Sequence, residues 1–280
     1  MNSLCEMKKF FLQQYTDTER EIVGIWATDC LYNPIGNGRI FKCKFIVVQT
    51  QVGQGCAYSE HDQYDSEKLV KLVKLVGKDC LKCELDDLAF EVACVDSLAE
   101  KIFYGYKTET IKLEGLSLNK LHARTEIIIN EAKKLVGNLV GKKVLNVGVV
   151  GDIIFQFLKH GCQVIGSDFD STIIGKTFFD KASIASGINT LDILKTVDIA
   201  VVTGMTIVTQ TLDSIINVCR EHNVKLIVFA ETGSNMAQYY VQQGVDCYLS
   251  ETFPFYIFNG ESTISITRRE RLESYLHEKN

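Results

Sequence analysis

The sequence predicts an α/β protein: a Rossmann-like parallel sheet that ends in a C-terminal antiparallel hairpin, preceded by a smaller α+β domain. Three observations support this prediction. Apolar strand-like and helix-like segments alternate from about Lys142 onward, which is typical of a parallel sheet with helices on both faces. A glycine turn joins the first strand and helix of that series, and an acidic residue ends its second strand. The first part instead contains two strand-like runs joined by a loop rich in turn-forming residues.

Length and composition favour two modest globular domains. The chain has 280 residues, of which 46% are hydrophobic, and two prolines, so disorder is not expected. A net charge of −5 argues against a nucleic-acid partner. Ten cysteines are scattered through apolar segments, which favours reduced thiols and a cytoplasmic location. No stretch is apolar enough to cross a membrane. We therefore expect a small-molecule substrate, and the sequence leaves a homo-oligomer open.

The first domain is predicted to cover residues 1–115. Turn-forming residues at 33–38 separate two of its strands and predict a hairpin, whereas helical spacing of apolar residues predicts a helix that includes Leu88, Val92 and Val95. The expected elements are a helix over 4–18, strands over 21–31 and 39–51, a loop over 53–65, and helices over 66–76 and 86–103.

The second domain is predicted to cover residues 116–280 and to begin with a linking helix. The Asn259-Gly260 pair between two β-prone runs predicts the terminal hairpin. The expected helices are 118–139, 152–160, 208–222 and 236–243; the expected strands are 143–149, 163–168, 198–203, 225–230 and 246–249, followed by 255–258 and 262–267.

The glycine turn after the first parallel strand is the main candidate site. Gly148 and Gly151 are three positions apart, and Asn146 stands where a dinucleotide fingerprint has its first glycine. Glycines allow a sharp turn and a close approach of a ligand to the backbone. Asp168 follows twenty positions after Gly148, where an acid can accept hydrogen bonds from both hydroxyls of a ribose. The alternative is that the glycines serve only helix–strand packing.

Asp152, at the start of the predicted helix, bears on which nucleotide would bind. A carboxylate there would repel the pyrophosphate that a dinucleotide lays on a helix N-terminus. S-adenosylmethionine has no phosphate and carries cationic groups, so it is the expected cofactor. The run 164–171, which contains Asp168 and Phe169, looks like the second-strand region of S-adenosylmethionine-dependent methyltransferases. The alternative is that Asp152 only caps its helix.

Polar residues follow the later parallel strands, at the edge of the sheet where ligands of α/β proteins bind. Thr203 and Gly204 could approach a nucleoside, Glu231 and Tyr256 are the candidates for orienting a nucleophile, and Glu251 could bind a polar or cationic substrate group. Helix capping, solvation and packing of the terminal hairpin are the alternatives for these residues.

Two segments contain residue types that bind metals. The loop 58–65 carries His61 and three carboxylates and could bind a cationic substrate or a metal, or be a solvated loop. Cys80 and Cys83 form the only Cys-x-x-Cys, and no second pair follows them, so no metal site is predicted there.

The second half also resembles a known family, that of putative heavy-metal chelation proteins. The resemblance lies in the segments 141–144, 198–204, 209–212 and 244–246. It implies an enolase N-terminal-like domain followed by a Rossmann-like domain, with a site in the cleft between them. The chain departs from the family at Asp152 and in the aromatic segment 253–258.

Three functions remain open on the sequence. The first is an enzyme that uses S-adenosylmethionine on a small molecule in an interdomain cleft, as a transferase or a lyase that cyclises the cofactor; catalysis would rest on positioning, because the sulfonium is already a good leaving group. The second is a metal-binding or metallophore-related protein without nucleotide chemistry. The third is an NAD-type dehydrogenase, which Asp152 and the missing first glycine disfavour.

Overall fold

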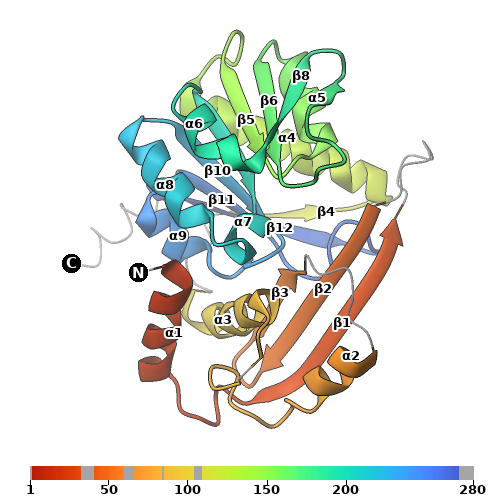
Figure 1. Cartoon of the computed structure of the whole chain (residues 1–280), viewed down its shortest axis with the longest axis vertical. Coiled ribbons are helices and arrows are strands. Elements are labelled where there is room, and N and C mark those ends of the chain that lie inside the picture. Colours follow the sequence, from red (N-terminus) through yellow and green to blue (C-terminus); the bar gives the residue numbers. More distant parts are fainter. Residues whose placement is uncertain (1, 33–40, 60–65, 84, 104–108, 271–280) are drawn as a thin grey trace.

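The computed structural model describes residues 2–32, 41–59, 66–83, 85–103 and 109–270. Two sheets organise the chain: a three-stranded antiparallel sheet near the N-terminus and a mostly parallel nine-stranded sheet (Figure 1). The predicted α/β class is confirmed. The predicted domain division at residues 115 and 116 stays a prediction.

The small sheet has the strand order β1-β2-β3. Its strands are β1 (Ile22–Tyr32), β2 (Phe41–Thr50) and β3 (Gln54–Tyr58). The predicted loop over 53–65 was wrong for residues 54–58, which form β3. A Cβ on Gly55 would lie 2.1 Å from the Ala93 carbonyl oxygen, so this glycine permits close packing on a helix rather than a turn.

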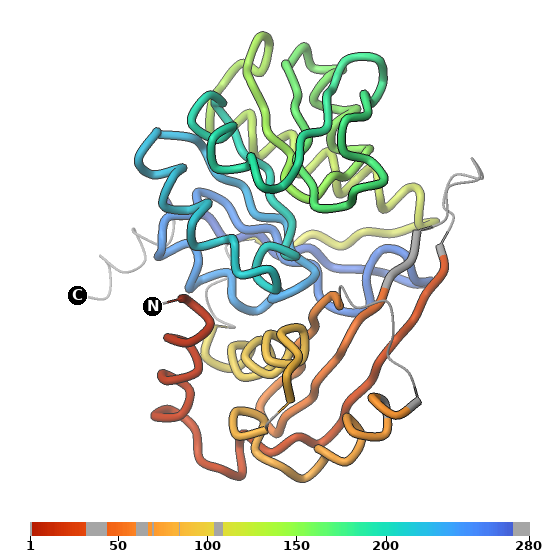
Figure 2. Tube along the Cα trace, viewed as in Figure 1, coloured from red at the N-terminus to blue at the C-terminus, as the bar shows by residue number. Residues whose placement is uncertain are grey.

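Three helices pack around the small sheet: α1 (Ser3–Gln14), α2 (Ser66–Val73) and α3 (Leu88–Phe103). The buried side chains of α3 include Val92, Val95 and Leu98, at the spacing that predicted this helix. The start of the chain reaches the other sheet's helices, where the Ser3 amide donates to the Asp213 carboxylate over 2.8 Å (Figure 2).

The large sheet has the order β4-β12-β11-β10-β9-β5-β6-β8-β7. The six strands from β11 to β8 are parallel and follow the 3-2-1-4-5-6 order of dinucleotide-binding Rossmann folds. The strands are β4 (Glu109–Leu113), β5 (Lys143–Val147), β6 (Gln163–Asp168), β7 (Thr177–Phe178), β8 (Ala182–Ser186), β9 (Ile199–Thr203), β10 (Lys225–Ala230), β11 (Cys247–Glu251) and β12 (Ser262–Arg268).

The antiparallel C-terminal end of this sheet is confirmed, but its pairing differs from the expected hairpin. β12 pairs with β11 on one side and with β4 on the other. The segment 255–258 is a turn, not a strand. Phe255 is buried against Phe45 of the small sheet, with ring centroids 4.8 Å apart, so the aromatic residues join the two sheets instead of extending one.

Helices cover both faces of the large sheet, as Figure 1 shows. One face carries α4 (Ser117–Val136) and α5 (Gly151–Lys159). The other carries α6 (Thr190–Leu194), α7 (Met205–Val208), α8 (Leu212–Glu221) and α9 (Ala237–Gln243). The helix predicted over 208–222 begins at Leu212 instead, because Gln210 adopts a left-handed φ of 55° and separates α8 from the short helix α7.

One apolar core runs through both parts of the chain. It joins Phe11 and Val95 of the small part to Val228 of β10 and Tyr240 of α9. The two sheets therefore share buried surface rather than touching only through polar contacts.

Candidate functional site

A pocket of about 410 Å³ lies at the carboxyl ends of β5, β6 and β9, on the face covered by α6, α7 and α8. This is the edge at which ligands of open α/β sheets bind. Four residues predicted from the sequence line it: Gly148, Asp168, Phe169 and Thr203.

The glycine turn packs closely against the side chain of Thr203. Gly148 has a φ of 73°, and a Cβ there would come within 2.2 Å of the Thr203 Oγ1 atom. Thr203 Oγ1 is itself buried and has no hydrogen-bond partner among the described residues. The glycine is thus required both for its backbone conformation and for the space it leaves.

The backbone amides of this turn are already bonded within the protein. The Gly148 amide donates to the Ser167 carbonyl, the Val149 amide to Asp168 Oδ2 over 2.7 Å, and the Val150 amide to Asn146 Oδ1 over 2.8 Å. The Asn146 side chain therefore stabilises the turn by accepting this hydrogen bond, and it occupies the position where a dinucleotide fingerprint would have a glycine.

Asp168 faces the pocket as its sole charged residue among the described residues that line it. Its Oδ2 accepts from the Val149 amide and its Oδ1 from the Asp170 amide, which fixes the carboxylate in place. Each carboxylate oxygen can accept roughly two hydrogen bonds, so acceptor capacity remains for a ligand.

Apolar side chains surround Asp168 and are unusually exposed. Phe169, Ile188 and Leu191 line the pocket and are 57%, 83% and 38% exposed, respectively. Exposed apolar groups gathered around a pocket are typical of a ligand site. Hydroxyl and amide side chains, including Thr206, also line the pocket, together with the apolar residues Val147, Met205 and Ile215.

Three other predicted cofactor residues do not line this pocket. Gly151 begins α5, and Gly204 lies against the Thr232 carbonyl, where a Cβ would approach to 2.6 Å. The Asp152 carboxylate instead lies 3.4 Å from the His122 ring on α4, and its Oδ2 atom is buried without a hydrogen-bond partner among the described residues. Asp152 therefore gives no support to the argument that a carboxylate repels phosphate at this pocket.

Glu231, Glu251 and Tyr256 come together, but on the opposite face of the sheet, around Arg124 of α4. Arg124 Nη1 lies 2.9 Å from Glu231 and 3.4 Å from Glu251. The guanidinium stacks on the Tyr256 ring at 3.8 Å and on the Phe229 ring at 4.5 Å. This buried group, called the Arg124 cluster below, contains two carboxylates and one cation.

Burial sets the ionisation of the Arg124 cluster. It raises the pKa of Glu231 to about 7, against the effect of Arg124, which favours the charged form. Burial would lower the pKa of Arg124, but Tyr256, Glu251 and Glu231 hold that pKa above its ordinary value, so the guanidinium stays charged.

The metal candidates gain no support from the described residues. His61 lies outside them. Cys80 is buried, and the Cys83 thiol donates to the Asp79 carbonyl. The described part of the chain holds no group of three or more histidine, cysteine or acidic side chains placed to bind a metal ion.

Among the residues that the structure describes, no helix has the length and hydrophobicity needed to cross a membrane.

Sequence reasoning missed Arg124 and the apolar residues Ile188 and Leu191. Arg124 had a readable signal, because it lies three positions after Leu121 and four before Ile128, on the buried face of α4. A charge on such a face requires a partner. Ile188 and Leu191 lie in a stretch without a clear periodic pattern, and only the fold brings them to Asp168.

Comparison with known proteins agrees with this fold. A family model named DUF364 and described as "Putative heavy-metal chelation" matches residues 131–230. No curated protein matches the sequence.

Two solved structures match the chain over almost its whole length, and a third matches about half of it. A DUF364 protein of unknown function from Desulfitobacterium hafniense matches with a TM-score of 0.53 and 12% identity, over 94% of this chain and 98% of the other. A second, from Pyrococcus horikoshii, matches with the same values. A dipicolinate synthase component from Bacillus halodurans matches over 46% of this chain and 45% of its own, with 15% identity and a TM-score of 0.36. The chain thus matches the DUF364 family in sequence over residues 131–230, and as a whole it has the fold of two DUF364 proteins.

Proposed function

We propose that the pocket at β5, β6 and β9 binds a phosphate-free adenosine-type ligand, and that this ligand is S-adenosylmethionine. The observation that carries the proposal is the state of the glycine turn. The amides of Gly148, Val149 and Val150, which a pyrophosphate would need as donors, are all bonded to groups of the protein itself.

The charge of the pocket supports the same conclusion. The described residues that line it include one carboxylate, Asp168, and no lysine, arginine or histidine. A pyrophosphate would therefore meet a negative charge and no cation. A ligand with a sulfonium and an ammonium would instead be attracted to this pocket.

The nucleoside has a matching place in the pocket. Asp168 has free acceptor capacity for the two ribose hydroxyls, and the exposed side chains of Phe169, Ile188 and Leu191 offer an apolar surface for the adenine. The buried Thr203 Oγ1 atom, which has no partner among the described residues, would receive a hydrogen bond from the ligand.

Under this proposal the protein is a transferase or a lyase that acts on a small molecule or on the cofactor itself. The sulfonium supplies the reactivity, so the protein would mainly position the reactants. Glu231 and Tyr256, the candidates for orienting a nucleophile, belong to the Arg124 cluster on the other face, so the proposal assigns them no catalytic step.

Calorimetry with purified protein tests the proposal. S-adenosylmethionine should bind, and NAD should not. Asp168→Ala should weaken binding by about ten- to a hundred-fold, because hydrogen bonds to a charged group are lost. Asp192→Ala is the matched control, since Asp192 lies on α6 but points to solvent and pairs with Lys195.

A second pair of variants keeps the turn intact. Ser214→Trp should fill the mouth of the pocket and abolish binding, whereas Glu221→Trp, on the same helix α8, should not. Binding of NAD but not S-adenosylmethionine would overturn the proposal in favour of a dehydrogenase. The 3-2-1-4-5-6 strand order is compatible with that alternative, because dinucleotide-binding folds have the same order.

The family description supports a second candidate, a metal-binding or metallophore-related protein. Its test is separate. Purified protein dialysed after incubation with zinc should retain a stoichiometric amount of metal and show no affinity for nucleosides. Retention of zinc together with S-adenosylmethionine binding would instead assign two ligands to the protein.

A further inference from the structure

The end of the large pocket farthest from Asp168 is formed by the turn between α7 and α8 and by the first turn of α8. Thr209, Gln210, Thr211 and Ser214 line the pocket there, and each carries a hydroxyl or an amide. This 209–214 segment follows β9, which is two strands away from β6 and its terminal Asp168. Two strand spacings place the ends of β6 and β9 about 10 Å apart.

The hydrogen bonds of Asn2 fix the orientation of the Gln210 amide. Asn2 Oδ1 accepts from the Cys5 amide over 2.9 Å at the start of α1, so Nδ2 is the donor of the Asn2 side chain. This Nδ2 atom donates to Gln210 Oε1 over 3.0 Å. Gln210 Nε2 bonds to no other described residue and therefore keeps two N–H donors for a ligand.

The backbone of Gln210 adopts a conformation that costs energy for a residue with a Cβ. Its φ of 55° lies in the left-handed region. The Gln210 amide donates to the Ile207 carbonyl over 3.2 Å, and Asn2 holds the side chain. A glycine would suit this φ better but would bring no donor to the pocket. Strained residues of this kind are frequent where proteins clamp a ligand.

Hydroxyl groups surround the Gln210 amide. The Thr209 and Thr211 hydroxyl oxygens are 2.9 Å apart. Ser214 follows Thr211 by three positions, so the two side chains lie on the same face of α8, and this face lines the pocket. The 209–214 segment thus presents neutral donors, and no basic side chain is among the described residues of the pocket lining.

The start of α8 favours a negatively charged group at this end of the pocket. A helix N-terminus carries partial positive charge, and the side chain of the N-cap residue Thr211 does not cap α8. The acid in the first turn, Asp213, does not line the pocket. Its carboxylate accepts from the Ser3 amide over 2.8 Å and from the Ser3 hydroxyl instead. Neutral donors and this partial charge can hold a group with a single negative charge, such as a carboxylate.

We propose that Gln210, together with the Thr211 and Ser214 hydroxyls, binds the carboxylate of the ligand. The pocket then selects adenosyl compounds that carry an amino-acid carboxylate over those that lack it. This inference rests on the proposed function and adds the orientation of the ligand: the ribose lies at Asp168, and the amino acid extends across β5 to the 209–214 segment. The chain from the ribose through the sulfonium to the carboxylate has a length comparable with the separation of the two strand ends.

Calorimetry with two ligands that differ only in the carboxylate tests this inference. The unmodified chain should bind S-adenosylmethionine about ten- to a hundred-fold more tightly than decarboxylated S-adenosylmethionine, because hydrogen bonds to a charged group are lost. This comparison does not depend on the folding of any variant.

Gln210→Glu should remove the preference for the carboxylate. Glutamate keeps an acceptor for Asn2 but replaces the two donors of Nε2 by a negatively charged oxygen. The affinity for S-adenosylmethionine should fall by about tenfold or more, whereas the affinity for the decarboxylated compound should stay equal or rise. Gln242→Glu is the matched control, since it adds the same charge at an exposed position of α9 outside the pocket lining and should change neither affinity.

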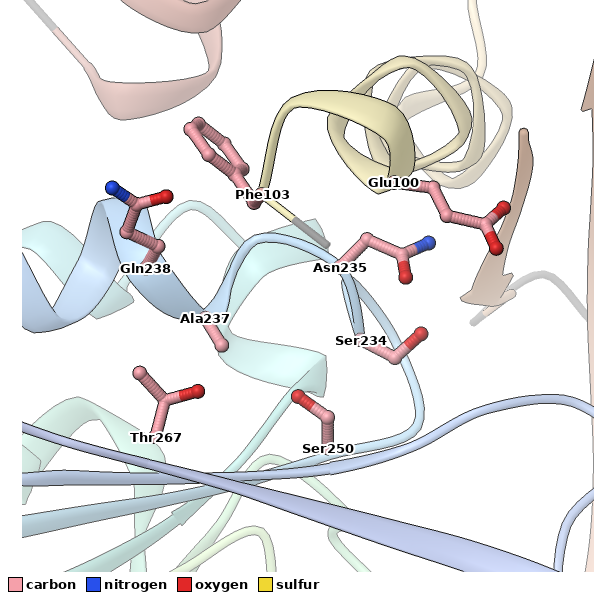
Figure 3. A pocket seen from close by; sticks show the side chains of 8 residues that line it. All are labelled: Glu100, Phe103, Ser234, Asn235, Ala237, Gln238, Ser250 and Thr267. Atoms are coloured by element: carbon pink, nitrogen blue, oxygen red, sulfur yellow. The ribbon is translucent and has the colours of Figure 1, made fainter. Parts of the chain in front are cut away.

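Asn2→Ala tests the positioning role of Asn2. It releases the Gln210 amide and should lower the preference for S-adenosylmethionine by about two- to tenfold. Asn235 provides the control, because it also joins the two parts of the chain but does not line the large pocket. Figure 3 shows Asn235 in the turn before α9, beside the end of α3. Its Nδ2 atom donates to the carbonyls of Gln54 and Asp96, so Asn235→Ala should lower Tm without changing the ratio of the two affinities.

The outcomes separate this inference from the proposed function. Equal affinities of the unmodified chain for the two compounds would overturn the carboxylate site, as would a Gln210→Glu variant that weakens both compounds equally. Either result would leave binding of S-adenosylmethionine at Asp168 in place. Failure of both compounds to bind would overturn the proposed function, and the carboxylate site with it.

Discussion

Arg124→Met should be one of the most destabilising single substitutions in the chain. The Arg124 side chain is 4% exposed, contacts Glu231 and Glu251, and stacks between two aromatic rings. Methionine has a similar length and could occupy the space between the rings. It would remove the cation, however, and leave the Glu231 and Glu251 carboxylates without a positively charged partner in the cluster.

The magnitude follows from burial. Glu251 is 0% exposed, so its charge cannot be solvated when Arg124 is lost. Breaking a buried ion pair from one side costs about 3–5 kcal/mol, and the lost stacking of a desolvated cation on Tyr256 adds about 1–2 kcal/mol. We therefore expect a loss of about 4–6 kcal/mol in the free energy of unfolding.

Urea unfolding followed by circular dichroism measures this loss. Arg124→Met/Glu251→Gln should recover a large part of it, because glutamine keeps an acceptor for the Tyr256 amide without the charge. Arg220→Met is the control, since Arg220 is exposed and its one described bond is to the Gln243 carbonyl at 3.4 Å. A loss below about 1 kcal/mol, or a double variant less stable than the single one, would refute the reasoning.

Two further predictions concern Glu231 and the glycine turn. The pKa of Glu231 in the folded protein is raised to about 7, so the contribution of this group to stability is full below pH 4.5 and is lost as the pH rises through 7. Glu231→Gln should therefore reduce the change in the free energy of unfolding between pH 5 and 8 by about 1–3 kcal/mol. Gly148→Ala should destabilise by more than Gly175→Ala, whose φ is equally positive but whose Cβ would meet nothing among the described residues, and Thr203→Ala should recover part of the difference. Equal losses at the two glycines in urea unfolding would show that contact with Thr203 has no role.

Most of the large sheet could be predicted because its signals are local. Each parallel strand is a short apolar run, and most are followed by a helix with its own periodicity. The strand β3 could not be predicted, because Gly55 suggests a turn and only the packing of α3 explains it. The pairing of β12 with β4 joins residues about 150 positions apart and left no local trace.

Some residues of the candidate site could likewise be predicted from the sequence, and others could not. Gly148 and Asp168 could be found from spacing alone, since a turn and a strand end are short-range features. Asp152 could not be placed correctly, because its neighbour His122 comes from α4, a helix that precedes the first parallel strand β5. The role of Asn146 under the turn is likewise visible only in its bond to the Val150 amide.

The most direct test of the proposed function is a crystal structure of the full chain with S-adenosylmethionine. We predict that the ribose hydroxyls lie within hydrogen-bond distance of Asp168 and the adenine against Phe169, Ile188 and Leu191, with the turn amides still bonded to Asn146 and Asp168. A ligand seated elsewhere, or a pocket that remains empty at saturating S-adenosylmethionine while NAD occupies it, would contradict the proposal.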